Sequence, residues 1–165
     1  MSLFKFFIIV VLSLFVVSCG FTPVYKEITD DQTIENLASI EINVPKNLMG
    51  QSFKYTLTDI LNPEGIKVIP KYNLDVKIDR TNTPLAIETN QTITRYKTIV
   101  RIDYVMKDVN TSAVVSQGYM KREGEYDKVA SDYATYVSEE DVTKRLVKEL
   151  AEDARMRIIS VLANK

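Results

Sequence analysis

The chain of 165 residues contains no histidine and no tryptophan, and it has a single cysteine. Without histidine, the chain cannot build a Ser-His-Asp triad, an imidazole base or a histidine-ligated metal site. Its five glycines, at positions 20, 50, 65, 118 and 124, form neither a G-x-G-x-x-G pattern nor a phosphate-binding loop. These absences exclude most hydrolase chemistries.

The charge is nearly balanced, with 21 basic and 22 acidic side chains. Nucleic-acid-binding domains are usually strongly basic, so we expect no nucleic-acid partner. Paired carboxylates could support glycoside hydrolysis, but acidic residues scattered over a soluble domain form such pairs by chance. We therefore expect a protein that is not an enzyme, with no catalytic residues, no metal site and no cofactor.

The single cysteine, Cys19, directly follows the most apolar run of the chain, from Phe6 to Val17. One cation, Lys5, precedes this run, which is too short to span a bilayer and fits the apolar region of a secretory signal. The segment Val16-Val17-Ser18-Cys19 resembles a bacterial lipobox. This resemblance implies that residues 1–18 are a signal peptide that is removed. It also implies an S-diacylglycerol on the Cys19 thiol and an acyl chain on the new amino terminus.

The alternative for Cys19 is a small buried side chain inside an uncleaved apolar segment. The lipobox interpretation is favoured because the small residue and the cysteine fall where the apolar run ends. Several acyl chains together hold a protein firmly on its membrane, whereas one chain holds it only marginally. By analogy with lipoproteins, aspartate after the cysteine commonly retains the protein at the inner membrane. Gly20 at this position therefore implies the outer membrane.

Hydrophobic periodicity predicts six elements in residues 39–165, which we expect to form a single domain. Residues 19–38 show no clear period, so we expect a lipidated tether there. Apolar and polar residues alternate, as in half-buried strands, over residues 40–44, 72–79, 92–107 and 113 to about 122. Apolar residues recur every three or four positions, as in helices, over residues 49–61 and from 138 to about 162.

Three features refine this prediction. The third strand is unusually long, so we expect a β-bulge or an end that projects past the sheet. We expect Gly124 to end or bend the fourth strand. Ser138 and Asp141 resemble a capping box for the last helix, although that helix could also start near Ser131. Its apolar stripe is expected to pack on the sheet through Leu146, Leu150, Ala154 and Ile158.

The expected fold class is therefore α+β. We expect a four-stranded, mostly antiparallel sheet with two helices packed on one face, in the order β-α-β-β-β-α.

Several short motifs together resemble one family of lipoproteins. Cys19 and the following Gly20-Phe21-Thr22-Pro23-Val24-Tyr25 resemble the "C-G-F-x-P-L-Y" opening of the LptE family, the lipopolysaccharide-assembly lipoproteins of Gram-negative outer membranes. The resemblance continues through Gly50-Gln51, Thr94-Arg95-Tyr96, Asp103-Tyr104, Lys107-Asp108, Glu125-Tyr126 and Ser131-Asp132-Tyr133-Ala134. It differs in the hairpin turn, where Asn110-Thr111 replaces a more typical Thr-Gly pair.

This resemblance implies a role in lipopolysaccharide assembly and export. The protein would be lipid-anchored in the outer membrane, facing the periplasm and the barrel lumen, as plug and assembly partner of an LptD-type β-barrel. One alternative is an auxiliary lipoprotein of an inner-membrane ABC-type lipid transporter. Another is a structural lipoprotein that binds no lipid.

Three basic residues are candidates for binding the phosphates of lipopolysaccharide. The two-residue period places Arg95, Lys97 and Arg101 on one face of the long third strand. Arginine can meet a phosphate with two parallel hydrogen bonds. Either Lys121 or Arg122 could extend the patch from the fourth strand, but adjacent residues point to opposite faces, so only one can contribute. The alternative is an ordinary solvated strand face, on which Asp103 also lies.

Overall fold

The computed structural model describes residues 31–87 and 93–163. The predicted signal peptide, Cys19 and the first part of the predicted tether lie outside these residues. The element order is α3 (Asp31–Ala38), β1 (Ile40–Asn43), α4 (Leu48–Leu61), β2 (Tyr72–Ile87), β3 (Ile93–Asp108), β4 (Val114–Asp127) and α5 (Asp132–Ala163). The predicted α+β class and the order β-α-β-β-β-α are confirmed, with one additional short helix, α3, ahead of β1.

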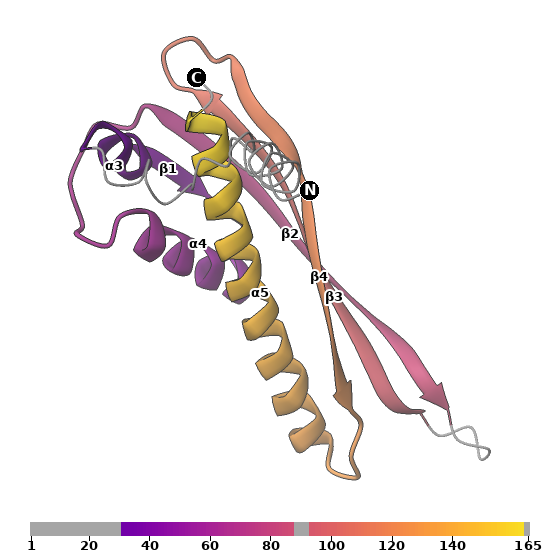
Figure 1. The fold of residues 1–165 in the computed structure, drawn as a ribbon. Helices are drawn as coiled ribbons and strands as arrows, with labels where there is room; N and C mark the ends of the chain where they lie inside the picture. The colour runs from indigo at the N-terminus through magenta and orange to yellow at the C-terminus, as the bar shows by residue number, and fades with distance from the viewer. Residues whose placement is uncertain (1–30, 88–92, 164–165) are drawn as a thin grey trace, which may run out of the picture.

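The four strands form one sheet in the order β1-β2-β3-β4 (Figure 1). β1 runs parallel to β2, because α4 carries the chain across between them, and the other two pairs are antiparallel. The prediction of a mostly antiparallel four-stranded sheet is therefore confirmed.

Alternation along the strands gives the sheet one apolar face. Leu74, Val76 and Ile78 of β2 are buried, and so are Val100 and Ile102 of β3. The predicted stripe of α5 is also buried, at Leu146, Leu150, Ala154 and Ile158. α4 joins the same core through Phe53, Leu57 and Leu61. Both long helices thus pack on one face of the sheet, as predicted.

The first turn of α4 has a side-chain cap, and the backbone of the preceding loop passes close to it. The Asn47 side chain accepts a hydrogen bond of 2.7 Å from the Gly50 amide, which is the usual way to satisfy an amide in the first turn. A Cβ atom at Gly50 would collide with the carbonyl oxygen of Pro45. Glycine is therefore required where the β1–α4 connection crosses the first turn of the helix.

α5 begins earlier than the predicted capping box. The Ser131 hydroxyl accepts a hydrogen bond of 3.3 Å from the Ala134 amide, and the helix runs from Asp132. The Ser138 hydroxyl lies inside the helix and donates to the Ala134 carbonyl at 2.9 Å. The capping-box prediction is therefore wrong and the alternative start near Ser131 is confirmed, because a serine inside a helix can bond back to the preceding turn. In the part of the chain that the structure describes, α5 and the other helices lack the length or apolar content needed to cross a bilayer.

Two of the strands, β2 and β4, extend further than their apolar patterns predicted. β2 continues from the predicted end at Asp79 to Ile87, paired with β3 throughout. The irregularity expected in the third strand lies between Ala86 and Ile87, where the pairing with β2 skips Thr94 of β3. Two further register shifts, between Pro84 and Ala86 and between Met106 and Lys107, place the extra residue on β2 and on β4.

β4 continues through Gly124 to Asp127, so the prediction that Gly124 ends this strand is wrong. Glycine at position 124 leaves room for α5 to pack against the strand. A Cβ atom at Gly124 would lie only 2.8 Å from Val142 Cγ1 of that helix.

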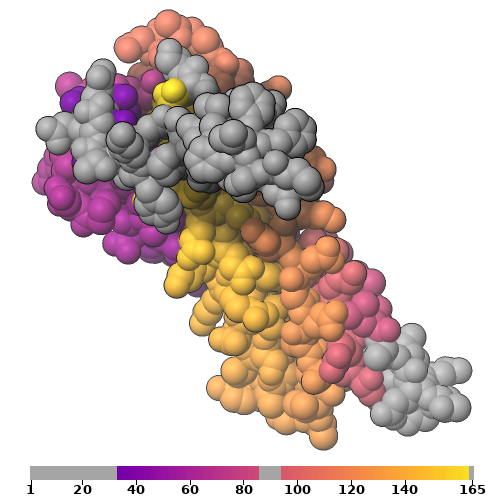
Figure 2. All heavy atoms as spheres, viewed as in Figure 1, coloured from indigo at the N-terminus to yellow at the C-terminus, as the bar shows by residue number. Residues whose placement is uncertain are grey.

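The molecule is elongated and has two different ends (Figures 1 and 2). We call the base the end formed by α3, the loop of residues 62–71 and the β3–β4 turn of residues 109–113. The Lys71 amide donates to the Ser39 carbonyl, and the Lys71 carbonyl accepts from the Val109 amide, both at 2.9 Å. We call the tip the opposite end, which holds the far part of the β2–β3 hairpin and the first turns of α5.

Candidate functional site

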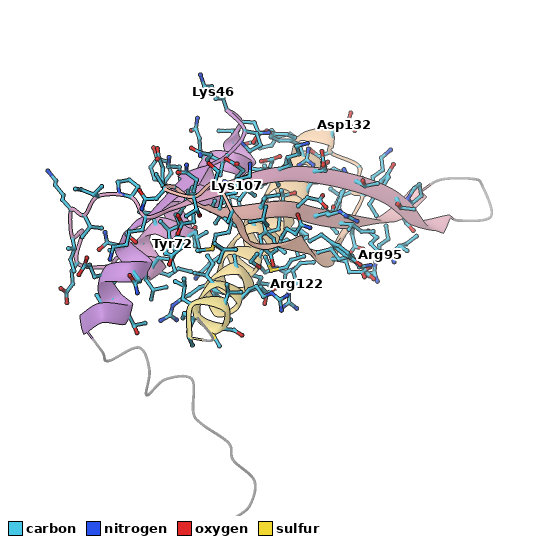
Figure 3. All side chains as sticks on the ribbon, turned by 90° about the horizontal axis from the view of Figure 1, so that it is seen from above. Lys46, Tyr72, Arg95, Lys107, Arg122 and Asp132 are labelled. Carbon is cyan, nitrogen blue, oxygen red and sulfur yellow. The ribbon has the colours of Figure 1, made fainter. Side chains whose placement is uncertain are left out.

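The candidate site is the face of the sheet that the helices leave open. β3 places the predicted residues Arg95, Lys97 and Arg101 on this face, because its buried residues Thr98, Val100 and Ile102 have the opposite parity. Figure 3 shows Arg95 near the tip, with Lys107 on the same strand toward the base. The structure therefore brings the three predicted cations onto one surface.

Each of these three cations faces a carboxylate on the same surface. Arg95 donates to Asp127 at 2.7 Å and lies 3.7 Å from Glu125. Lys97 pairs with Glu123 at 3.3 Å. The acidic partners come from β4, which runs antiparallel beside β3, so the ion pairs link the two strands across the open face.

Arg101 makes a pair with two hydrogen bonds along its own strand. Its guanidinium donates to both oxygens of Asp103, at 2.6 and 3.0 Å. The same guanidinium lies over the ring of Tyr119, 4.1 Å from its centre, which is a cation–π geometry. Tyr119 is 59% exposed, so this stacked pair is part of the open surface.

The ion pairs keep both signs of charge on this face. Hydrogen bonding to Asp127 raises the pKa of the Arg95 guanidinium, and hydrogen bonding to Asp103 raises the pKa of Arg101. The hydrogen bonds from Arg101 lower the pKa of the Asp103 carboxyl below its usual value. A phosphate could bind these cations only by displacing, or sharing them with, the carboxylates already present.

The neighbouring pair on β4 divides between the two faces, as the sequence indicated. Lys121 lies opposite Arg101 on the open face, 4.0 Å from Glu123. Arg122 points to the helical side, where it donates two hydrogen bonds of 2.7 Å to Asp153 of α5. That contact raises the pKa of the Arg122 guanidinium through hydrogen bonding. Arg122 therefore serves helix packing and is not available to the predicted patch.

A shallow hollow lies on the open face, closer to the base. Its volume is about 720 Å³, and its lining includes Lys77, Asp103, Val105 and Tyr119. The sequence analysis did not single out Tyr119 or this hollow. The alternation of β4 could have placed Tyr119 on the open face, but the hollow is lined by residues from all four strands and depends on how these strands pair.

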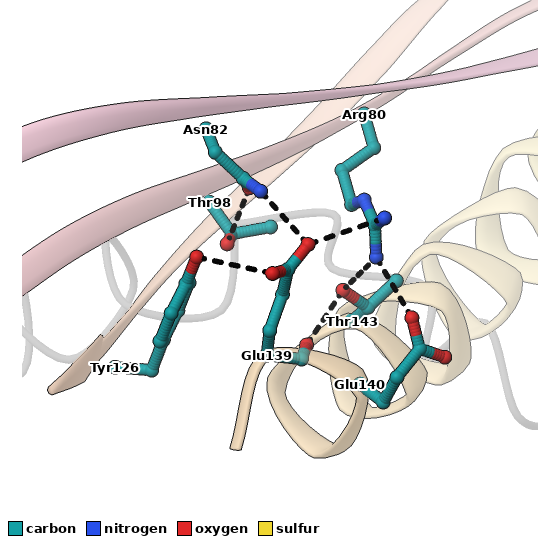
Figure 4. Close-up of polar contacts among 7 residues, drawn as sticks. All are labelled: Arg80, Asn82, Thr98, Tyr126, Glu139, Glu140 and Thr143. Atoms are coloured by element: carbon teal, nitrogen blue, oxygen red, sulfur yellow. Dashed lines mark hydrogen bonds and ion pairs between the residues drawn. The ribbon is translucent and has the colours of Figure 1, made fainter. Parts of the chain in front are cut away.

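A second polar cluster lies on the helical side near the tip, between the sheet and α5 (Figure 4). Glu139 is its centre. One carboxylate oxygen accepts from Asn82 at 2.8 Å and pairs with Arg80 at 3.2 Å, and the other accepts from Tyr126 at 3.2 Å. The Asn82 oxygen in turn accepts from the buried hydroxyl of Thr98 at 2.9 Å.

Arg80 connects this cluster to the next turn of α5. It pairs with Glu140 at 3.0 Å and donates to the Thr143 hydroxyl at 3.2 Å. Thr143 donates in turn to the Glu139 carbonyl at 2.8 Å. We call the seven residues of Figure 4 the tip network; they are Arg80, Asn82, Thr98, Tyr126, Glu139, Glu140 and Thr143.

The environment of Tyr126 follows from its place in this network. Burial, and then the nearby Glu139 carboxylate, raise the pKa of Tyr126 from 10.0 to about 12. Its ring also stacks on Tyr96, with ring centres 5.5 Å apart. Hydrogen bonds or ion pairs connect all the side chains drawn in Figure 4, so the cluster fixes the position of α5 on the sheet.

No protein-family model matches the chain. An uncharacterized protein of Rickettsia prowazekii is 24% identical over 160 residues, which cover 97% of this chain and 99% of that relative. The described fold is also similar to solved structures of bacterial lipoproteins.

A candidate lipoprotein of Caulobacter crescentus superposes with a TM-score of 0.65 at 19% identity, covering 81% of this chain and 96% of that structure. The rare lipoprotein B of Shewanella oneidensis gives a TM-score of 0.60 at 12% identity, over 76% of this chain and 96% of that structure. A minor lipoprotein of Acinetobacter baumannii gives 0.56 at 10% identity, over 75% and 92%. The chain therefore shares its fold with these proteins.

Proposed function

We propose that this protein is an outer-membrane lipoprotein of the LptE type, anchored through Cys19, that assists the assembly and export of lipopolysaccharide. In this proposal it is the plug and assembly partner of an LptD-type β-barrel and faces the periplasm and the barrel lumen. It has no catalytic role.

The proposal is carried by the coincidence of two independent features. The described fold matches lipoproteins over more than nine tenths of their solved chains. The lipobox-like segment ending at Cys19 lies outside the residues that the structure describes and is a feature of the sequence alone. A signal that directs lipidation and a fold found in lipoproteins support the same kind of protein.

The open face of the sheet is suited to contact with a polar surface of a partner protein. The lumen of an outer-membrane barrel is lined by polar side chains, so a plug needs a surface that tolerates wet, charged contact. The paired charges of Arg95, Lys97 and Arg101 provide both signs along one strand pair. In our proposal these cations also meet the phosphates of lipopolysaccharide by exchanging their carboxylate partners for phosphate oxygens.

The first experiment identifies the anchor and the partner together. The protein is purified from its native membranes in mild detergent, and its intact mass and co-purifying proteins are determined. We expect a chain that begins at Cys19 and carries several acyl chains, together with a large outer-membrane barrel. A free thiol or a retained segment 1–18 would overturn the anchor. A co-purifying inner-membrane permease would replace our proposal with the transporter alternative, and the absence of both partners would favour a structural lipoprotein.

The second experiment tests the predicted phosphate contacts. Arg95, Lys97 and Arg101 are all replaced by serine, and binding of purified lipopolysaccharide is measured as a function of salt concentration. The matched control replaces the exposed cations Lys144, Arg145 and Lys148 of α5, which changes the net charge equally. Loss of binding and a weaker salt dependence in the first variant alone would support the patch. Equal behaviour of the two variants would contradict it, and loss of barrel association in the first variant would assign the open face to the partner.

A further inference from the structure

Exposed aliphatic side chains gather on two loops at the base. Ile69, in the loop after α4, is 87% exposed, and Ile66 of the same loop is 37% exposed. Val109 and Val114, at either end of the β3–β4 turn, are 41% and 53% exposed. We call these four residues the base patch. The hydrogen bond between the Val109 amide and the Lys71 carbonyl holds the two loops together, so the four residues belong to one end of the molecule.

Local structure keeps these side chains outward. Asn62 bonds both the amide and the carbonyl of Ile66 at 2.9 Å, and Gly65 takes a left-handed conformation with φ of 64°. Pro70 follows Ile69 and fixes the backbone before β2 begins. The loop is thus a shaped support for exposed aliphatic residues. Such residues commonly mark a surface that meets a protein or a membrane.

The position of the lipid anchor indicates that the base patch contacts a membrane. α3 lies at the base, because Ser39 at its end bonds to Lys71 and Glu35 pairs with Lys71 at 3.1 Å. The segment from Cys19 to Asp31 can reach at most about 40 Å. α5 has 32 residues and is therefore about 48 Å long, which separates the tip from the base by more than that reach. A lipid on Cys19 therefore lets the base reach the bilayer and excludes an upright orientation with the tip toward it.

We propose that the base patch is a second, non-covalent membrane contact that inserts Ile69 and its neighbours into a phospholipid surface beside the lipid anchor. This inference rests on the proposed lipid anchor at Cys19. Because the lipid anchor already holds the protein at the membrane, the base patch has a high effective concentration there. Even a small apolar patch can then remain bound to the bilayer. Lys67 borders the patch and suits the phosphate groups of lipid heads. The contact would fix the direction in which the base meets the membrane.

Because the chain contains no tryptophan, a single introduced tryptophan is an unambiguous reporter. The full lipoprotein carrying Ile69→Trp is purified from membranes and reconstituted into phosphatidylethanolamine–phosphatidylcholine vesicles with brominated acyl chains. The matched control is Tyr133→Trp at the tip, where the native side chain is 77% exposed. We expect the Ile69→Trp emission to shift to the blue and to be quenched roughly twofold or more, as for a group 5–10 Å inside the interface, and the control to keep its emission.

Vesicle flotation separates the two proposals. Protein that does not float overturns the lipid anchor, and with it this orientation of the base. Protein that floats with an unquenched Ile69→Trp, or with equal quenching at Tyr133→Trp, leaves the anchor intact and overturns the membrane contact. Both positions are exposed, so the substitutions should leave the unfolding transition unchanged, and circular dichroism verifies this.

Discussion

The two halves of α5 are held on the sheet in different ways. Toward the base, Leu146, Leu150 and Ala154 are almost fully buried among apolar residues of the sheet and α4. Toward the tip, the same helix is held by Glu139 and Glu140, which bind Arg80, Asn82 and Tyr126. The change occurs on neighbouring residues of β2, where buried Ile78 is followed on the same face by Arg80 and Asn82.

This difference shows how an elongated domain can extend beyond its core. Near the base, α4 covers the sheet beside α5, so apolar side chains are closed off from water on several sides. Near the tip, α5 is the only described helix that covers the strands, and the Arg80 and Glu139 side chains remain 29% and 20% exposed. Partly hydrated polar groups with matched partners suit such an edge better than large aliphatic groups. We therefore expect the base to supply most of the stability and the tip network to set the position of the helix.

The largest effect is expected at the centre of the apolar half. Leu150→Ala removes a fully buried side chain and should lower the free energy of unfolding by about 2 to 5 kcal/mol. Reversible urea denaturation measures the change. Met156→Ala is the control, because Met156 lies on the same helix and is 43% exposed; it should change stability by less than about 0.5 kcal/mol. Similar values for both variants would contradict an apolar anchor at the base.

A smaller effect is expected in the tip network. Glu139→Gln keeps a similar shape but removes the charge that Arg80 and two neutral donors meet, which should cost about 1.5 to 3 kcal/mol. The control is Glu35→Gln, which removes an exposed pair with Lys71 and should cost less than about 1 kcal/mol. Hydrogen exchange gives a second measurement. Faster exchange confined to the first turns of α5 is expected, and uniform acceleration along the helix would show that the two halves are not distinct.

The contact between β4 and α5 gives a further test at the boundary of the two halves. Gly124→Ala places a methyl group against Val142 and should cost about 1 to 3 kcal/mol by overpacking. Adding Val142→Ala should recover part of this loss. Gly118→Ala is the control, because its new methyl group would meet Tyr104 at ordinary contact distances of 3.4 Å and more. No recovery in the double variant would mean that the cost of Gly124→Ala has another origin.

The smallest effect concerns pH. The raised pKa of Tyr126 means that the folded state holds this proton more tightly than the unfolded state. Its stabilising contribution is thus complete below pH 10 and is lost as the pH rises through about 12. Tyr126→Phe should cost about 1 kcal/mol at neutral pH, through the lost hydrogen bond to Glu139. The difference in unfolding free energy between wild type and variant should shrink above pH 10, and a constant difference would contradict this account.

Much of the fold could be predicted because the apolar residues repeat with the period of their element. The alternation at Leu74, Val76 and Ile78 and the helical stripe through Leu146 and Leu150 both correspond to buried residues. The prediction failed where the side chains between the sheet and α5 are polar. β2 was expected to stop near Asp79 because polar residues follow, yet those residues pair with α5 and the strand continues.

The sequence predicted where the residues of the candidate site lie, but it did not predict their ion-pair partners. Period alone places Arg95, Lys97 and Arg101 on one face, and the structure brings them together there. Their carboxylate partners on β4 depend on the register between two strands, which a pattern in one strand does not contain. Binding of phosphates to these cations stays a prediction, as do the lipid on Cys19 and the barrel partner.

The sequence by itself determined which faces are apolar, the order of the main elements and the absence of histidine chemistry, because these follow from residue type and spacing along the chain. The tertiary structure alone decided the start of α5, the role of Gly124 and the tip network. In the last two, atoms from segments far apart in sequence come within a few ångströms. α3 was also decided by packing, since its eight residues are too few to show a period and Leu37 is buried against the core. Contacts of this kind depend on how the elements meet in space, and no local pattern records them.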